Sequence, residues 1–160
     1  MRIYNLSKTA RDELVDNLAK ISGGNEIKPR ELKIAESDDP EYAIVFAKEE
    51  NLYLGKKKDS YFPLLRDESI LEGKPVVTVD SGAVKFVCNG ANIMRPGIVK
   101  IEGEFGPDDL LIVKEQKYNK PIAIGKAMMS REEMQAASKG VVVTNLHYVG
   151  DKFWEMLKEL

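Results

Sequence analysis

The segment Pro75 to Gly97 restricts the fold of this chain most strongly, because its character changes several times over a short distance. Apolar, mostly β-branched residues from Pro75 to Val79 predict a strand, and Asp80-Ser81-Gly82 predicts a turn. A short helix is expected over Ala83 to Cys88, with Asp80 or Ser81 as its N-cap. A strand, a glycine turn and a helix start therefore follow one another, and the glycine allows another backbone to come close.

A basic loop completes this segment. Arg95 precedes the Pro96-Gly97 turn, so we expect its side chain to project from the loop rather than enter the core. Lys85 falls near the helix start, where a cation is unfavourable to the helix dipole unless a phosphate lies nearby. Free N–H groups at a helix start also favour an anion. One interpretation is therefore a site for a phosphate-bearing ligand, and the other is a set of glycines that serve only tight turns.

The 160 residues are predicted to form two domains, 1–73 and 74–160, with the boundary at Gly73-Lys74-Pro75. In the first domain, apolar residues at steps of four, four and three predict a helix that ends at Gly23-Gly24; they are Ala10, Leu14, Leu18 and Ile21. A helical turn is expected over Arg66 to Glu72. Between the two helical segments lie the candidate strands Glu31 to Glu36, Tyr42 to Ala47 and Asn51 to Gly55. This pattern indicates an α+β unit with a small antiparallel sheet.

The second domain carries strand signals at close spacing, which is typical of a small barrel. After the strand at Pro75, the predicted strands are Ile98 to Ile101, Leu110 to Lys114 and Pro121 to Met128. A turn at Lys117 to Lys120 separates the last two. Residues 141–148 form either a final pair of strands or one bent strand.

Two further helices are predicted in the second domain. Ser130 and Glu133 have the spacing of a capping box and start the first of them. Asp151 is expected to cap a terminal helix, which we assign to this domain. Aromatic residues near this helix could serve as a stacking platform for bases. For Tyr148, Phe153 and Trp154, we favour instead a role as core residues that close one end of the barrel.

Motifs for catalysis are scarce. The chain has one cysteine, Cys88, and one histidine, His147, and neither lies in a recognisable nucleophile motif. No P-loop is present, and no GxGxxG pattern follows a strand. Acidic pairs such as Asp108-Asp109 have a ready explanation as loop charge. We therefore expect neither an enzyme nor a metal or cofactor site, and we expect His147 to belong to the core.

Charge and hydropathy narrow the possible partners. The net charge is −2 with the two signs nearly balanced, which argues against a basic surface over the whole molecule but leaves room for a local one. No apolar run reaches the length of a membrane span, and the first residues lack the apolar core of a signal peptide. The simplest expectation is a cytoplasmic protein without a membrane partner.

Two longer segments resemble a known RNA-binding module. The segment VDSGAVKFVCNGANIMRPGIV resembles the signature of the PUA domain, named after pseudouridine synthase and archaeosine transglycosylase. The segment PIAIGKAMMSREEMQAASKGVVVTNLHYVGD resembles its closing strands and the helix between them. Together with the ending NLHYVGDKFWEML, they resemble the malignant T-cell-amplified sequence family and its archaeal counterparts over Pro75 to Leu157. One departure is Arg95, where the eukaryotic members carry a cysteine.

The resemblance implies an α/β N-terminal domain with an antiparallel sheet, followed by a PUA-type β-pseudobarrel. It implies a non-enzymatic RNA-binding protein of the translation apparatus that binds tRNA, the small ribosomal subunit or both, with a translation factor as partner protein. One alternative is a PUA accessory subunit that positions tRNA or rRNA for a separate modifying enzyme, and another is an enzyme in its own right. The RNA-binding positions that the resemblance implies are Gly82, Ala83, Lys85, Phe86, Arg95, Gly97 and Lys126.

Overall fold

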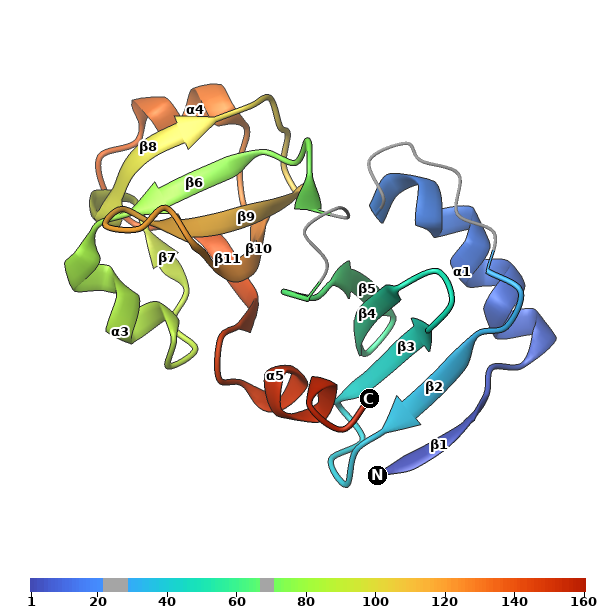
Figure 1. Ribbon diagram of the computed structural model, residues 1–160. Coiled ribbons are helices and arrows are strands. Elements are labelled where there is room, and N and C mark those ends of the chain that lie inside the picture. The colour runs from blue at the N-terminus through green and yellow to red at the C-terminus, as the bar shows by residue number, and fades with distance from the viewer. Residues whose placement is uncertain (22–28, 67–70) are drawn as a thin grey trace. The chain divides into compact units, whose positions relative to one another are not determined.

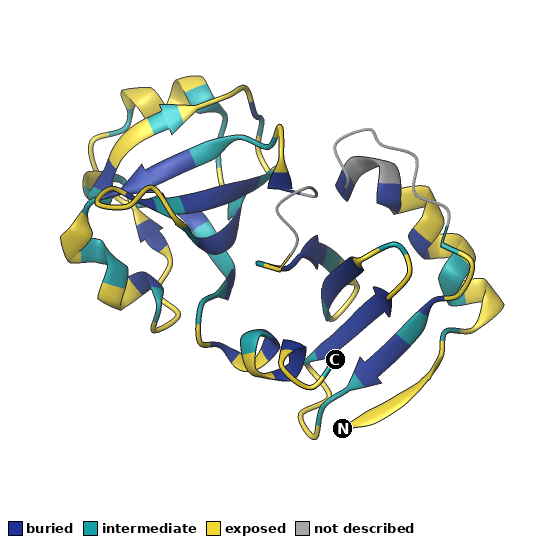
Figure 2. Ribbon diagram, viewed as in Figure 1, coloured by how far each residue is buried: buried dark blue, intermediate teal, exposed yellow. Residues whose placement is uncertain are grey.

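The computed structural model describes residues 1–21, 29–66 and 71–160, and the chain divides into two units (Figure 1). The first unit comprises residues 1–72 and 152–160, and the second comprises residues 73–151. Figure 2 shows that the central strands of both units are largely buried. In the described part of the chain, no helix is both long and apolar enough to cross a membrane.

The first unit is built on an antiparallel sheet whose spatial order follows the chain, β1-β2-β3-β4-β5. Its strands are β1 (Arg2–Asn5), β2 (Lys33–Glu36), β3 (Ala43–Ala47), β4 (Leu52–Lys57) and β5 (Ser60–Pro63). The continuous apolar run predicted as a central strand is β3, which is buried on both faces. The prediction of a small antiparallel sheet is therefore confirmed.

Helix α1 (Lys8–Ile21) directs the predicted apolar stripe inward, with Leu14, Leu18 and Ile21 buried. Ser7 caps its start, because the Ser7 hydroxyl accepts a hydrogen bond from the Ala10 N–H at 3.2 Å. The predicted helix stop at Gly23-Gly24 lies outside the described residues, as does most of the helical turn predicted to begin at Arg66.

The C-terminal helix α5 (Lys152–Leu157) groups with the first unit, whereas the sequence placed it in the second domain. Phe153 is fully buried, and its ring packs edge-on against Phe62 at a centroid distance of 5.4 Å and tilted against Tyr42 at 5.1 Å. The expectation that Phe153 closes one end of the barrel is therefore wrong. Of that predicted aromatic set, Tyr148 does pack against the core of the second unit.

The second unit contains a curled six-stranded sheet in the order β7-β11-β10-β9-β6-β8. Strands β6 and β9 are parallel, and the other neighbours are antiparallel. The strands are β6 (Val76–Val79), β7 (Ile93–Met94), β8 (Ile98–Glu102), β9 (Leu110–Glu115), β10 (Pro121–Ala127) and β11 (Val141–Tyr148). Of the two readings of residues 141–148, the single strand is correct. The predicted mixed fold with a barrel-like second half is confirmed.

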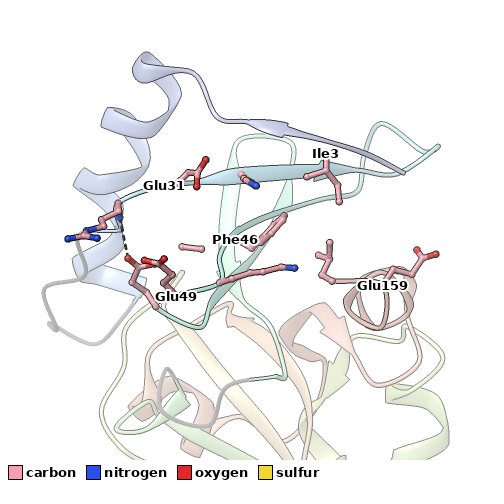
Figure 3. A pocket seen from close by; sticks show the side chains of 11 residues that line it. Ile3, Glu31, Phe46, Glu49 and Glu159 are labelled. Carbon is pink, nitrogen blue, oxygen red and sulfur yellow. Dashed lines mark hydrogen bonds between the residues drawn. The ribbon is translucent and has the colours of Figure 1, made fainter.

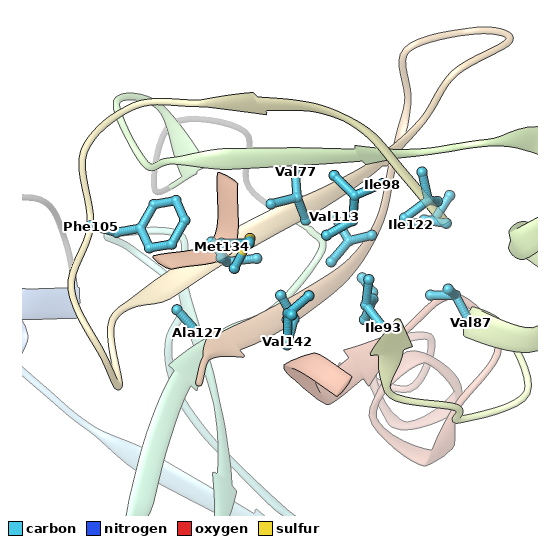
Figure 4. Close-up of a cluster of buried hydrophobic side chains, with 14 residues drawn as sticks. Val77, Val87, Ile93, Ile98, Phe105, Val113, Ile122, Ala127, Met134 and Val142 are labelled. Atoms are coloured by element: carbon cyan, nitrogen blue, oxygen red, sulfur yellow. The ribbon is translucent and has the colours of Figure 1, made fainter. Parts of the chain in front are cut away.

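The inner face of this sheet forms one apolar core (Figure 4). Val77, Val113 and Met134 are each fully buried in it. Met134 comes from helix α4 (Arg131–Ala136), which begins with the predicted capping box. The Ser130 hydroxyl accepts from the Glu133 N–H at 3.2 Å, and the Glu133 carboxylate accepts from the Ser130 N–H at 3.4 Å. The cap fixes the start of α4 and so places Met134 over the core.

Candidate functional site

Asp80 fixes the start of the loop that follows β6. Its carboxylate Oδ1 accepts a hydrogen bond from the Ala83 N–H at 3.1 Å, which makes it the N-cap of the short 3-10 helix η1 (Ser81–Ala83). Its own N–H donates to the Gly97 carbonyl at 2.9 Å. Of the two predicted cap residues, Asp80 therefore performs the role, and it also joins the two glycine-bearing loops.

The one-turn helix α3 (Val84–Val87) ends in a Schellman motif. The Ala91 N–H donates to the Phe86 carbonyl at 3.0 Å, and the Gly90 N–H donates to the Val87 carbonyl at 3.1 Å. Gly90 has φ +94°, a left-handed conformation that glycine adopts without strain. The predicted stop at Asn89-Gly90 is correct, and it turns the chain back toward β7.

Asn145 on β11 holds this turn in place, although the sequence analysis did not single it out. Its side-chain amide donates to the Val87 carbonyl at 3.0 Å and to the Ala91 carbonyl at 2.9 Å. Its backbone N–H donates to the side-chain oxygen of Asn92 at 2.9 Å. The only signal in the sequence was a polar amide inside an otherwise mostly apolar strand.

A pocket of about 430 Å³ opens among η1, α3, β7 and the loop at Gly97. Gly82, Ala83, Phe86 and Gly97, four of the seven predicted RNA-binding residues, line it. Most of the other lining residues are apolar, and Asp80 and Asn92 are the polar ones. Phe86 and Met94 are 59% and 48% exposed, so large apolar side chains remain open to solvent at this pocket.

The predicted cations do not line the pocket, but Lys85 lies beside it. Lys85 is exposed, and its Nζ lies 5.0 Å from the centroid of the Phe86 ring. The expected conflict between Lys85 and the helix dipole is small, because α3 has only four residues and the dipole is a sum over the aligned peptide units of a helix. Lys126 lies half-buried on β10, opposite Thr144 of β11.

Arg95 does not project from its loop as expected. Its Nε donates to the Met134 carbonyl at 2.7 Å, and its Nη1 donates to the Ile98 carbonyl at 3.2 Å. Met134 lies in the last turn of α4, where the final carbonyls lack partners within the helix. The half-buried guanidinium therefore caps α4 from a loop 39 positions earlier in the chain, and this partner is what holds the side chain down.

The one histidine and the one cysteine that the sequence singled out do not line this pocket. His147 is fully buried, as expected, and its Nδ1 lies 2.9 Å from the Asp151 carboxylate. Cys88 is half-buried, and burial raises the pKa of its thiol. Within residues 1–21, 29–66 and 71–160, no group of three His, Cys, Asp or Glu side chains could hold a metal ion.

The first unit has a pocket of its own, of about 460 Å³ (Figure 3). Phe46 and Ile3 contribute apolar surface, and Glu31, Glu49 and Glu159 contribute carboxylates. Basic residues also line it, so charges of both signs face the same space. None of the predicted RNA-binding residues lies here.

Comparison with known proteins places this geometry in a family. Residues 75–149 match the PUA domain family. An uncharacterized protein of Methanocaldococcus jannaschii is 40% identical over 133 residues, which cover 81% of this chain and 80% of that protein. Translation machinery-associated protein 20 of Saccharomyces cerevisiae is 27% identical over 162 residues, 96% of this chain and 90% of the relative. Human Malignant T-cell-amplified sequence 2 is 32% identical over 114 residues, 67% of this chain and 61% of the relative.

Solved structures share the fold over nearly the whole chain. A hypothetical protein from Pyrococcus horikoshii OT3 aligns with a TM-score of 0.75 and 34% identity, covering 97% of this chain and 99% of that one. A PUA domain from Aeropyrum pernix K1, solved as a tartrate complex, aligns with a TM-score of 0.77 and 26% identity, covering 98% of this chain and 91% of that one. Family match, relatives and fold agree, and the chain therefore belongs to the PUA-domain family, with homologues among the Translation machinery-associated protein 20 and Malignant T-cell-amplified sequence proteins.

Proposed function

We propose that this chain is an RNA-binding protein of the translation apparatus and that the pocket at Phe86 receives a base of single-stranded RNA. The PUA-domain match and the relatives named as translation machinery-associated proteins support the general role. Within that role, we assign tRNA, the small ribosomal subunit or both as the target. The translation-factor partner expected from the sequence belongs to the same proposal.

The observation that carries the proposal is the chemistry of the pocket. Its lining is largely apolar and includes the exposed Phe86, and Asp80 is its acidic residue. An unstacked base has an apolar face that can stack on an aromatic ring, and a polar edge that can form hydrogen bonds. Phe86 supplies the ring, and Asp80 can accept a hydrogen bond from an amino group on the base. A flat ring with N–H donors fits this site better than an anion does.

Phosphate binding at the start of the helix is correspondingly disfavoured. The Ala83 N–H already donates to the Asp80 carboxylate, and that carboxylate would repel an incoming phosphate. We assign phosphate contacts to the exposed Lys85, and a more peripheral one to Lys126. Gly82 and Gly97 contribute only backbone atoms to the wall of the pocket, and Ala83 adds only a methyl group. Arg95 acts by positioning the loop.

Equilibrium binding to fluorescein-labelled single-stranded RNA, followed by anisotropy, tests the proposed site. Stacking contributes about 1–3 kcal/mol per base, so Phe86→Ala should weaken binding by about 5- to 150-fold. Met128→Ala is the matched control, because Met128 is an apolar residue that is 51% exposed in the same unit but does not line the pocket. Equal affinities of the two variants for RNA would refute the pocket as the binding site.

Sedimentation through sucrose gradients tests the target in translation. The tagged wild-type chain should migrate with small ribosomal subunits, and Phe86→Ala should shift it to the top of the gradient. Sequencing of crosslinked RNA then identifies tRNA or rRNA. Recovery in a stable complex with an RNA-modifying enzyme, and absence from the ribosomal fractions, would favour the accessory-subunit alternative instead.

A further inference from the structure

The connection between β9 and β10, Gln116 to Lys120, is built around a buried carboxylate. Glu115 is only 7% exposed, and its carboxylate accepts hydrogen bonds from the Tyr118 N–H at 2.8 and 3.0 Å and from the Lys120 N–H at 3.1 Å. The Glu115 N–H closes the loop by donating to the Lys120 carbonyl at 3.0 Å. The loop therefore has a defined shape before any ligand arrives.

The charge on Glu115 maintains this shape at neutral pH. Burial alone would raise the pKa of the carboxyl group, but hydrogen bonds from the backbone N–H groups of Tyr118, Lys120 and Lys117, together with the Lys120 charge, lower it further than burial raises it. The net pKa lies below the ordinary value. Glu115 therefore stays ionised, and it keeps accepting the bonds that shape the loop.

The loop displays an exposed aromatic ring with a cation beside it. Tyr118 is 67% exposed, and the Nζ of Lys117 lies 5.1 Å from the centroid of its ring. Lys120 is also exposed. Tyr118 is the most exposed large apolar residue of the described chain, so its ring contributes little to the fold. The Tyr118 ring offers a base a stacking surface, and Lys117 and Lys120, which precede and follow it in the sequence, offer positive charge to phosphates.

This loop begins next to the Phe86 pocket. Glu115 is the register partner of Val79 across the parallel strands β6 and β9, and the Gln116 N–H donates to the Val79 carbonyl at 3.0 Å. Val79 and the residue after it, Asp80, both line the pocket. Figure 1 shows the loop, in orange, crossing the end of β6 near the start of α3. A strand bound at the pocket can thus continue onto the loop.

We infer that the loop Gln116 to Lys120 is a second contact for single-stranded RNA, which extends the site proposed above and rests on that proposal. Tyr118 stacks on a base further along the strand, beyond the nucleotide adjacent to the one held at Phe86, and Lys117 and Lys120 neutralise the phosphates beside it. Glu115 is the positioning residue, because the loop displays Tyr118 only while its backbone is held. Because the two contacts lie in sequence along one RNA strand, the length of the RNA determines whether the second one is used.

RNA length separates this inference from the proposed function. We would measure the affinity of the full chain and its variants for a dinucleotide and for an octanucleotide of the same base. Tyr118→Ala should lower the affinity for the octanucleotide by about 5- to 150-fold and leave the affinity for the dinucleotide unchanged. Phe86→Ala should weaken both. Tyr118→Phe should retain most of the affinity, since it keeps the ring, and circular dichroism checks that each variant is folded.

Charge is tested with a matched pair of double variants. The double variant Lys117→Ala with Lys120→Ala should have a shallower log–log slope of octanucleotide affinity against salt concentration. The expected change is about 1.4, or about 0.7 for each phosphate contact. Lys8→Ala with Lys152→Ala removes the same net charge from exposed positions in the first unit and should leave the slope unchanged.

The outcomes are distinct. If Tyr118→Ala binds the octanucleotide as well as the wild type does while Phe86→Ala fails, the second contact is wrong and the pocket stands. If the wild type binds neither RNA, both proposals fall. If the two double variants change the slope equally, only the overall charge matters and the loop has no role of its own.

Discussion

Replacing Arg95 by alanine separates two roles that the sequence could not distinguish, phosphate contact and loop positioning. The guanidinium donates to the carbonyls of Met134 and Ile98 at 2.7 and 3.2 Å. Hydrogen bonds that involve a charged group contribute about 1.5–3 kcal/mol each when buried. Since Arg95 is half-buried and the freed carbonyls can reach water, we expect a loss of about 1–3 kcal/mol for the pair.

A loss of this size is measurable in a small domain. A change of 1 kcal/mol shifts the melting temperature of a domain of 60–100 residues by about 4–8 °C. Thermal denaturation followed by circular dichroism should therefore place Arg95→Ala about 4–24 °C below the wild type. Lys85→Ala is the matched control because Lys85 is exposed, and it should change the stability by less than about 0.5 kcal/mol.

The salt dependence of RNA binding should change in Lys85→Ala and not in Arg95→Ala, the reverse of the effect on stability. Lys85→Ala removes a proposed phosphate contact, so its slope should become shallower by about 0.7. Arg95→Ala should keep the wild-type slope even where its affinity is lower, because the loop moves but no phosphate contact is lost. An unchanged melting temperature together with a shallower slope for Arg95→Ala would show that Arg95 contacts the RNA directly, and the positioning role would be wrong.

Four further outcomes follow from particular contacts. Gly125→Ala should cost about 1–3 kcal/mol of stability, since a Cβ there would lie 2.4 Å from Val143 Cγ1; chemical denaturation measures it. Phe153→Ala should cost about 3–5 kcal/mol by the same assay, because the ring is fully buried between two aromatic neighbours. The lowered pKa of Glu115 means that its stabilisation is present above the unfolded value of about 4.3 and is lost as the pH falls through the folded value. The protection of the Tyr118 N–H from hydrogen exchange, relative to the intrinsic exchange rate at each pH, should therefore be lost only in acid. Wild-type RNA binding should have a shallow total log–log salt slope of about −2 to −4, and salt-independent affinity would favour a protein-binding module.

Local signals predicted much of the fold because their partners lie close in the sequence. The Ser130 capping box spans three residues, and both of its hydrogen bonds are present. The apolar stripe of α1 is set by the helical period alone, and its predicted members from Leu14 onward are buried. The Gly90 stop likewise depends on carbonyls of the preceding turn. In each case the sequence contains both halves of the interaction within one turn or strand.

The predictions that failed concern residues whose partners lie far away in the sequence. Arg95 is held by a carbonyl 39 positions away, and Phe153 packs against Phe62, which is 91 positions away. Contacts over such sequence separations produce no periodic pattern in the sequence. The position of Arg95 in a glycine loop therefore suggested a ligand contact. The position of Phe153 in a helix after the last strand suggested packing against the core of the second domain. Asn145 was overlooked for the same reason, since its carbonyl acceptors are supplied by Val87 and Ala91.

Asp80 shows why the candidate site differs from a phosphate site even though its glycines are where the sequence placed them. Asp80 caps η1 with its carboxylate and is also a lining residue of the pocket, so the residue that lets the helix begin also makes its start repellent to anions. Replacing Asp80 by asparagine keeps an acceptor for the Ala83 N–H and removes the charge. If the pocket holds the amino edge of a base, this variant should bind RNA more weakly at high salt, where backbone attraction is screened. If a phosphate enters instead, the same variant should bind more tightly, most clearly at low salt, because the repulsion has been removed.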